Sequence, residues 1–281
     1  MAGASIVVVG VGSIGRRHIR NLIALGVDPT DISAVDIRLN QFNTTDIAGI
    51  GVQTVWCGRE ISEDDLGNPT AMLICTPAHL HAQFIAYAQR RQIPFFVEKP
   101  VTLSTAEPID WSSAVPHLVA CNMRFRPELQ ALKAIAAGAC TGRFECTQDM
   151  STWPGVSYAD PIFEFCHEID LALWMFGPID AVTTVTRTAR VYEIALEHSN
   201  HKTSTVRIGD APGAPTRRWG LVHYERSFVQ AFEHERDVNW MYLDEMAHFL
   251  RVARGDEPSV NTLRDARRVL EVCEFAIGAC A

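Results

Sequence analysis

The chain has 281 residues, 47% hydrophobic and 21% charged, an ordinary globular composition with enough length for two domains. Its formal net charge of −8, without an extended run of Lys or Arg, argues against a nucleic-acid or anionic-membrane surface. No apolar run reaches the roughly 18 residues of a membrane span, and the first residues lack the basic segment of a signal peptide, so we expect a cytoplasmic protein.

The first part of the chain alternates short apolar runs with helical patterns. Strands are predicted over residues 5–10, 32–37, 52–57, 71–76, 93–98 and 118–122. Helices are predicted over residues 14–25, 80–91 and much of 104–114. Apolar strands that alternate with helices indicate a parallel sheet covered on both faces, so residues 1–122 are predicted to form a doubly wound α/β domain.

The pattern changes after residue 122. Helices are predicted over residues 127–137, 164–176, 241–254 and 263–276, and a strand over 144–151. Further strands, over residues 181–187, 192–197, 203–208 and 218–225, succeed one another as antiparallel neighbours do. Residues 123–281 are therefore predicted to form an α+β domain with an open, mainly antiparallel sheet.

The eight cysteines include no C-x-x-C pair, and several lie within apolar strands or helices. We therefore expect reduced, mostly buried thiols and neither a disulfide nor a metal site. His79 and His81 have no partner cluster in the sequence, so we assign them to a loop and a helix start rather than to a metal.

The stretch "VVVGVGSIGRRH" carries a dinucleotide-binding signal. It places Gly10, Gly12 and Gly15 in G-x-G-x-x-G register directly after a strand and at the start of a helix. In such a turn the first glycine permits the bend, the second lets a diphosphate approach the backbone, and the third allows close helix–strand packing. Asp36 ends the second strand, where a ribose-binding carboxylate is expected. Together these residues predict a Rossmann domain.

Asp36 also bears on the choice between cofactors. A carboxylate accepts hydrogen bonds from a ribose 2′-hydroxyl and repels a 2′-phosphate, which favours NAD over NADP. Arg38 leaves NADP open, because a guanidinium pairs with a phosphate as readily as it stacks on adenine.

Five motifs in order give the chain a family resemblance. "GVGSIGRRHIRNL", "CTPAHLHA", "FFVEKPVTL", "CNMRFRP" and "HEIDLALWMFG" resemble the Gfo/Idh/MocA oxidoreductases, and the resemblance covers nearly the whole chain. It implies an NAD(P)-dependent oxidoreductase whose second domain binds the substrate and builds a homodimer or homotetramer.

The family's E-K-P motif matches Glu98, Lys99 and Pro100. Strand ends of a parallel sheet face the ligand crevice, so Lys99 would emerge beside the nicotinamide and stabilise alkoxide character on the substrate oxygen. Glu98 would anchor Lys99 or the nicotinamide ribose. The alternative is a surface Glu–Lys pair at a strand end.

The resemblance also implies a catalytic histidine in the second domain. His167 would act as general acid/base, with Glu164 as the carboxylate that precedes it on the same helix. A core histidine satisfied by a neighbouring carboxylate is the alternative. The chain departs from the family in carrying Glu164 where aspartate is usual and in a shortened segment before it, which leaves the substrate class less determined than the cofactor.

Four residues are candidates for substrate binding besides His167. Asn122 would position the substrate or the cofactor amide, and Arg124 and Arg126 suggest an anionic substrate, with salt bridges at a domain interface as the alternative. Trp153 would offer a stacking surface for a sugar or, alternatively, pack in the core. The predicted cofactor-binding residues are Gly10, Gly12, Ser13, Ile14, Gly15, Asp36, Arg38, Thr76, Pro77, His81, Glu98 and Lys99.

The sequence thus predicts a hydride-transferring dehydrogenase that acts on a secondary alcohol or ketone of a sugar, cyclitol or nucleotide-sugar. Two alternatives stay open: a reductase of a C=N or other unsaturated bond on the same fold, and a non-catalytic nucleotide-binding sensor.

Overall fold

The computed structural model describes residues 5–37, 49–58, 60–152, 160–213, 216–223, 226–232 and 239–280. The chain divides into two units, one formed by Met1–Ala120 with Asn239–Arg264 and the other by Cys121–Val238 with Asp265–Ala281. The chain first passes from one unit to the other after Ala120, two residues from the boundary predicted at residue 122. The sequence assigned all of residues 123–281 to the second domain, whereas the structure returns residues 239–264 to the first unit.

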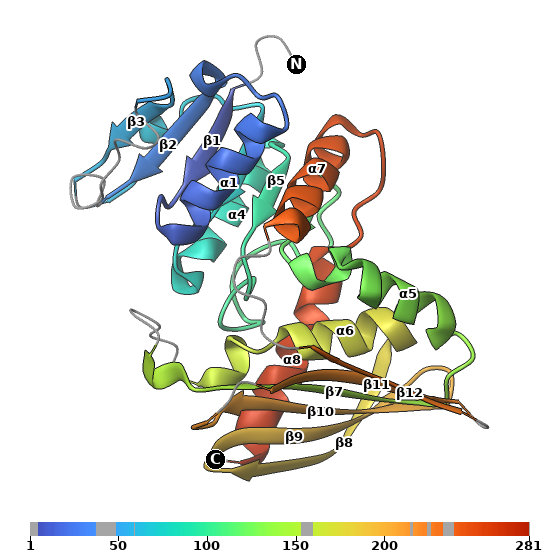
Figure 1. Cartoon of the computed structure of the whole chain (residues 1–281). Helices are drawn as coiled ribbons and strands as arrows, with labels where there is room; N and C mark the ends of the chain where they lie inside the picture. Colours follow the sequence, from blue (N-terminus) through green and yellow to red (C-terminus); the bar gives the residue numbers. More distant parts are fainter. Residues whose placement is uncertain are drawn as a thin grey trace. The chain divides into compact units, whose positions relative to one another are not determined.

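The first unit is built on a six-stranded parallel sheet (Figure 1). Its order is β3-β2-β1-β4-β5-β6, the arrangement of a Rossmann fold, so the predicted fold class is confirmed. The order reverses between β1 and β4, which makes the carboxyl ends of these strands the ligand crevice of the fold. The strands are β1 (Ile6–Val9), β2 (Ile32–Asp36), β3 (Gln53–Trp56), β4 (Ala71–Ile74), β5 (Phe95–Val97) and β6 (His117–Val119).

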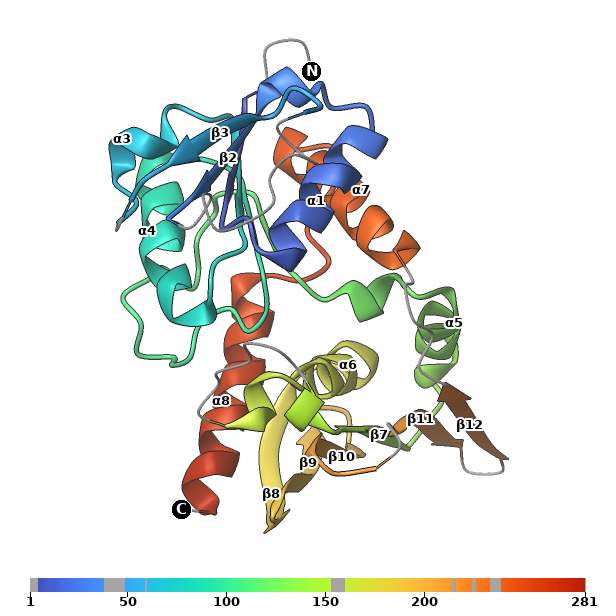
Figure 2. The same cartoon turned by 60° about the vertical axis from the view of Figure 1, so that its left-hand side comes forward.

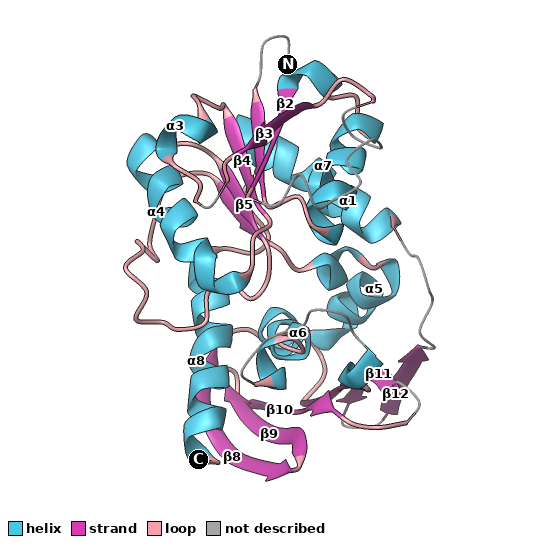
Figure 3. Cartoon of the chain, turned by 90° about the vertical axis from the view of Figure 1, so that its left-hand side faces the viewer, coloured by secondary structure: helices cyan, strands magenta, loops and turns pink. Residues whose placement is uncertain are grey.

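Helices cover both faces of this sheet (Figures 2 and 3). Helices α1 (Ser13–Ala24) and α7 (Trp240–Arg254) lie on one face, and α3 (Glu63–Leu66) and α4 (His81–Arg91) on the other. The strands are apolar on both faces because side chains alternate between two buried layers. The core beneath α1 and α7 contains Ile6, Val8, Ile19, Leu22, Ile32, Leu73, Phe96, Leu118, Met246 and Phe249.

Helix α7 completes the nucleotide-binding unit. Phe249 is fully buried, and its ring packs edge-on against Phe96 of β5 with centroids 5.8 Å apart. The Asn239 side-chain amide before the helix donates to Asn21 Oδ1 of α1 at 2.8 Å. The amphipathic pattern of residues 241–254 predicted the helix, but such a pattern does not identify the surface that the helix covers.

The predicted helix within residues 104–114 is wrong. The segment between β5 and β6 consists of turns. Asp110 accepts from both the backbone N–H and the hydroxyl of Ser112, at 2.9 and 2.8 Å, and the Gln89 amide of α4 donates to the Asp110 carbonyl at 2.7 Å. Serine and aspartate side chains that bond nearby backbone groups compete with helix formation.

The second unit is a six-stranded sheet in the order β12-β11-β7-β10-β9-β8. Among the described strands of this second sheet, only the β7–β10 pair is parallel, so the predicted open, mainly antiparallel sheet is confirmed. The predicted strand 218–225 corresponds to β11, with residues 224–225 outside the described part of the chain, and the strand that pairs with it, β12, was not predicted. The strands are β7 (Thr141–Gln148), β8 (Ile179–Thr188), β9 (Arg190–His198), β10 (Lys202–Asp210), β11 (Thr216–His223) and β12 (Arg226–Phe232).

Helix α6 (His167–Phe176) packs on one face of this sheet, with α5 (Pro127–Ala136) beside it (Figure 1). Gly142 of β7 makes that contact possible, because a Cβ there would collide with the ring of Phe176. Helix α8 (Leu263–Ala279) is tied to the start of β8, where the Arg268 guanidinium donates to the Ile179 carbonyl.

The sequence predicted reduced, mostly buried thiols and no segment long enough to span a membrane. All eight cysteines are free, and Cys75, Cys121, Cys146, Cys166 and Cys273 are buried. Among the described residues, no helix combines the length and apolar composition that crossing a bilayer requires.

The position of α7 predicts an asymmetric effect of two phenylalanine substitutions. Phe249→Ala should lower the free energy of unfolding by about 3–5 kcal/mol, because it opens a cavity between α7 and β5. Phe275→Ala on α8 is the matched control, since that side chain is 53% exposed, and it should change stability by no more than about 0.5 kcal/mol. Urea unfolding measures both; equal losses would contradict the packing of α7 on the first unit.

Candidate functional site

The glycine turn joins β1 to α1 at the reversal point of the first sheet. Gly10 has φ of +90°, and a Cβ there would come within 2.6 Å of the Cys75 and Thr76 backbone. A Cβ on Gly15 would overlap the Gly10 carbonyl oxygen, whereas a Cβ on Gly12 would meet nothing within 4 Å. Two of the glycines are thus required by packing, and Gly12 borders open space at the amino end of α1, where a diphosphate is favoured.

Asp36 ends β2 beside this turn. The carboxylate is buried, and its Oδ2 accepts from the Val11 backbone N–H at 2.7 Å, which fixes its orientation against the turn. Ser13 and Ile14 form the first turn of α1, and their role beside a diphosphate stays a prediction. Arg38 lies outside the described residues.

Thr76 and Pro77 follow β4 at the same sheet edge. The Thr76 hydroxyl is buried and has no hydrogen-bond partner in the structure, which marks it as a group able to take one from a ligand. Pro77 precedes a short 3₁₀ helix that leads into α4. His81, the first residue of α4, has Nε2 at 2.7 Å from the Thr76 carbonyl and Nδ1 at 3.1 Å from the Pro100 carbonyl. The ring therefore connects the turns after β4 and β5, a structural role that the sequence did not indicate.

The E-K-P turn follows β5. Glu98 Oε1 lies 2.7 Å from His18 Nε2 of α1, and Glu98 Oε2 accepts from the Lys99 backbone N–H at 3.3 Å. Burial by itself raises the pKa of Glu98, but the hydrogen bond and charge of His18, together with the charge of Lys99, bring it below its ordinary value of 4.5. The carboxylate is therefore ionised at neutral pH. The Lys99–Pro100 peptide bond is cis.

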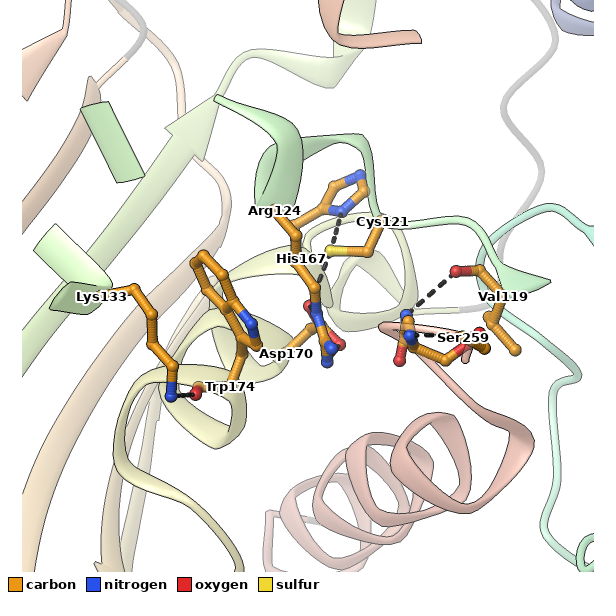
Figure 4. Close-up of polar contacts among 9 residues, drawn as sticks. Val119, Cys121, Arg124, Lys133, His167, Asp170, Trp174 and Ser259 are labelled. Carbon is orange, nitrogen blue, oxygen red and sulfur yellow. Dashed lines mark hydrogen bonds and ion pairs between the residues drawn. The ribbon is translucent and has the colours of Figure 1, made fainter. Parts of the chain in front are cut away.

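The second unit presents its candidate residues at the first turn of α6. Glu168 is fully buried and pairs with Arg217 of β11 at 2.9 Å. Asp170 receives two hydrogen bonds from Arg124, at 2.8 and 2.6 Å (Figure 4). Burial by itself would lower the pKa of Arg124, but the charge and hydrogen bonds of Asp170 raise it above its ordinary value. The helix dipole also favours carboxylates at the amino end of a helix. The Glu168–Arg217 and Asp170–Arg124 ion pairs therefore hold the first turn of α6 in place.

His167 is the first residue of α6, and it is partly exposed. Its Nδ1 lies 3.6 Å from Cys121 Sγ, and the same thiol is 2.6 Å from Asp170 Oδ2 (Figure 4). Glu164 was predicted to lie on the same helix; it instead falls in the turn before α6, so helical spacing does not place it over His167.

The substrate candidates of the second unit differ in their surroundings. The Asn122 side-chain Oδ1 is buried without a hydrogen-bond partner, which suits a ligand contact. Arg124 is paired with Asp170, and Arg126 lies 3.5 Å from Glu128, so both arginines form salt bridges within the second unit and not at the domain interface that the sequence left as an alternative. Trp153 lies outside the described residues.

Sequence reasoning did not assign roles to four residues of these clusters. His18 occupies a buried position in the helical pattern after the glycine turn, and a buried histidine signals a partner. Cys121, Glu168 and Arg217 gave no local signal, because each acts through a residue distant in sequence.

Comparison with known proteins agrees with this geometry. A family model described as an oxidoreductase family with an NAD-binding Rossmann fold, GFO_IDH_MocA, matches residues 4–115. The rhizopine catabolism protein MocA of Rhizobium meliloti is 24% identical over 298 residues, which cover 95% of this chain and 92% of that protein. Residues 4–115 are thus similar to the nucleotide-binding part of the Gfo/Idh/MocA oxidoreductases, and the similarity to the MocA protein runs along most of the chain. The resemblance predicted from its motifs is confirmed.

Solved structures extend the likeness of fold to the second unit. A myo-inositol 2-dehydrogenase from Lactobacillus plantarum superposes with a TM-score of 0.80 at 17% identity, covering 98% of this chain and 96% of that one. The UDP-N-acetylglucosamine 3-dehydrogenase GnnA from Acidithiobacillus ferrooxidans superposes with a TM-score of 0.78 at 20% sequence identity, covering 99% of this chain and 98% of that one. At these low sequence identities, the superpositions show that the chains share a fold and no more.

NAD is the cofactor of this oxidoreductase, as predicted. The residues at the carboxyl edge of the first sheet fit it. Gly12 leaves the space for a diphosphate, Asp36 carries the carboxylate for a ribose hydroxyl, and the Thr76 hydroxyl is buried without a protein partner.

The glycine turn predicts opposite effects of two alanine substitutions. Gly15→Ala should lower the melting temperature, because its Cβ would overlap the Gly10 carbonyl. Gly12→Ala should leave the melting temperature unchanged and weaken NADH binding at least about tenfold, a loss of about 1.4 kcal/mol, because its Cβ enters the space of the diphosphate. Thermal unfolding and NADH fluorescence titration measure the two effects. Unchanged NADH affinity in Gly12→Ala would refute the assigned cradle.

The Glu98–His18 pair predicts a pH-dependent stability difference. A carboxyl whose folded-state pKa is lowered stabilises the fold above its ordinary pKa of 4.5 and loses that contribution as the pH falls further. Wild type should therefore exceed Glu98→Gln in free energy of unfolding at pH 7, and the difference should shrink between about pH 5 and about pH 3. Urea unfolding across this range measures it, with the exposed Glu197→Gln as control. A difference that stayed constant would contradict an ionised Glu98.

Proposed function

We propose that the chain is an NAD-dependent dehydrogenase that transfers a hydride between nicotinamide and a secondary alcohol or ketone of a sugar or cyclitol. The observation that carries the proposal is the placement of Lys99 in the turn that follows β5, a turn held by Glu98 and by His81. The glycine turn and Thr76 lie at the same carboxyl edge of the sheet, the edge at which such folds bind their ligands.

Lys99 supplies the charge that this chemistry needs. Removing hydride from a carbinol carbon leaves its oxygen as a carbonyl once the hydroxyl proton departs, and an ammonium beside that oxygen stabilises the developing alkoxide. Glu98 accepts hydrogen bonds from the Lys99 backbone N–H and from His18 Nε2 of α1, so the turn that presents the lysine is fixed by α1. We assign Lys99 as the catalytic residue of the first unit.

The second unit supplies the proton acceptor in this proposal. His167 stands at the amino end of α6, in a turn anchored by Arg124 and Arg217, and an imidazole there takes the hydroxyl proton in oxidation and returns it in reduction. Asn122 is proposed to bind the substrate or the cofactor amide through its buried, unpartnered Oδ1. Glu164 and Arg126 are secondary candidates for the pocket wall.

The substrate class follows from the relatives and from the arginines. The relatives include an inositol 2-dehydrogenase and a UDP-N-acetylglucosamine 3-dehydrogenase, both of which act on ring hydroxyls by their names. Arg124 and Arg126 suggested an anionic substrate, but Arg124 is paired with Asp170 and is therefore not available to bind an anionic ring. We therefore propose a neutral polyhydroxylated ring as the reacting part of the substrate.

The test follows reduced nicotinamide by its absorbance, with NAD and NADP in separate reactions, across inositols, sugars, sugar acids and nucleotide-sugars. Lys99→Ala should lower kcat roughly 10²–10³-fold at saturating NAD, so that a change in cofactor affinity does not contribute to the loss. Lys202→Ala is the matched control, because Lys202 contacts the carbonyls of Ala136 and Ala137 in the second unit. Turnover of Lys99→Ala within a few-fold of wild type would refute the mechanism.

Two other outcomes would redirect the assignment. Retained activity after substitution of both Lys99 and His167 would favour reduction of a C=N bond. NADH binding without turnover on any of these substrates, together with a captured partner, would favour a sensor.

A further inference from the structure

Cys121 connects the proposed acid/base residue to a buried carboxylate. It precedes the 3₁₀ helix Asn122–Phe125 and is 2% exposed. Its Sγ lies 2.6 Å from Asp170 Oδ2 and 3.6 Å from His167 Nδ1 (Figure 4). Asp170 is in turn held by the Arg124 guanidinium through both of its oxygens. The four side chains therefore form one chain of polar contacts within the second unit.

The charges of this chain determine where its protons lie. Asp170 pairs with a guanidinium through both oxygens, so it is an ionised carboxylate and can only accept hydrogen bonds. The thiol at 2.6 Å from Oδ2 must then direct its proton at Asp170, because a sulfur lone pair or a thiolate would be repelled there. His167 Nδ1 lies 3.6 Å from the same sulfur, and with the thiol proton directed at Asp170 only sulfur lone pairs are left to meet it. A lone pair on His167 Nδ1 would be repelled by the sulfur lone pairs, whereas an N–H on Nδ1 can donate a hydrogen bond to the sulfur.

We propose that Cys121 is a positioning residue that holds the proton of neutral His167 on Nδ1 and so makes Nε2 the basic nitrogen. The inference rests on the proposed function for its catalytic meaning, but the tautomer itself is a property of the second unit alone. The same contact serves imidazolium, because Nδ1–H still meets the sulfur while Nε2 gains and loses the proton. Asp170 acts on the histidine through the thiol instead of by direct contact.

This arrangement differs from a carboxylate bonded directly to a histidine. Sulfur is a weak acceptor, so the thiol selects a tautomer without adding the full attraction of a carboxylate for imidazolium. A histidine held in the wrong tautomer is a poor base even where the surrounding geometry is intact. The thiol therefore contributes orientation and proton placement, which are separable from binding of the substrate.

The test is the protonation of the two His167 ring nitrogens, read by long-range ¹H–¹⁵N correlation of the unligated protein at a pH where the ring is neutral. The chain has ten histidines, and His167→Asn identifies the resonance by its loss. Wild type should show Nδ1 protonated and Nε2 bare. In Cys121→Ala the preference should shift toward the Nε2–H form, and Cys121→Ser should retain the wild-type form, because a hydroxyl also donates to Asp170 and accepts from Nδ1. Cys273→Ala, another buried thiol of the second unit, should change nothing.

Kinetics provide a second measurement once a substrate is known. Cys121→Ala should lower kcat about tenfold with KM nearly unchanged, well short of the roughly 10²–10⁴-fold that loss of a general acid/base costs. Cys121→Ser should recover most of that loss.

The wild-type spectrum is decisive even if a variant fails to fold. An Nε2-protonated His167 in wild type, or an unchanged tautomer in folded Cys121→Ala, would overturn the inference. The expected tautomers together with undiminished turnover by His167→Asn would support the thiol contact and overturn the proposed role of His167, so the two failures are distinguishable.

Discussion

A carboxylate taken out of water costs several kcal/mol unless its oxygens meet partners, and Glu98 satisfies this requirement at the end of β5. His18 and the Lys99 backbone N–H are the partners that its two oxygens meet. Because His18 belongs to α1, the helix that begins at the diphosphate cradle also fixes the turn that presents the lysine. The proposed diphosphate site and the proposed catalytic charge therefore share one support, and a shift of α1 would move both.

The second unit uses the same principle at α6. The first turn of this helix carries His167, Glu168 and Asp170. Without partners, the two buried carboxylates would destabilise the fold and the histidine side chain would be mobile. Arg217 reaches Glu168 from the sheet, and Arg124 and Cys121 reach Asp170 from the segment before α5. Functional side chains are positioned well when the groups around them are locked by contacts from different elements. These side-chain contacts join residues 46 to 49 positions apart in the sequence, so the position of the histidine depends on the fold of the whole unit.

Much of the fold was predictable because its signals are local. Apolar runs predicted the strands of the first sheet, and the glycine turn with Asp36 identified the cofactor edge. The helix predicted within residues 104–114 failed where the Asp110 carboxylate accepts from the backbone N–H and the hydroxyl of Ser112. The reach of α7 back to the first unit was also not predictable, since an amphipathic pattern indicates burial but not the partner surface.

Within the candidate site, the motif residues were predictable and their supports were not. Lys99, Glu98 and His167 stand in recognisable motifs, but His81 proved to connect two turns and Arg124 to be half of a buried ion pair. The contact of Cys121 with His167 joins residues 46 positions apart. Such pairs depend on where the chain returns in space, which spacing along a single sequence does not encode.

The return of residues 239–264 to the first unit also has a consequence for how the protein is made. A ribosome completes β1 through β6 long before it reaches Phe249, and the whole of residues 121–238 emerges in between. During that interval the face of the sheet that α7 will cover is an apolar surface beside α1. Domains whose segments are contiguous can fold as units during synthesis, but this nucleotide-binding unit has to wait for the carboxyl-terminal part of its own chain. Its final closure is therefore a late event in biosynthesis, and a chaperone that masks exposed apolar surface would act on the nascent chain over that interval.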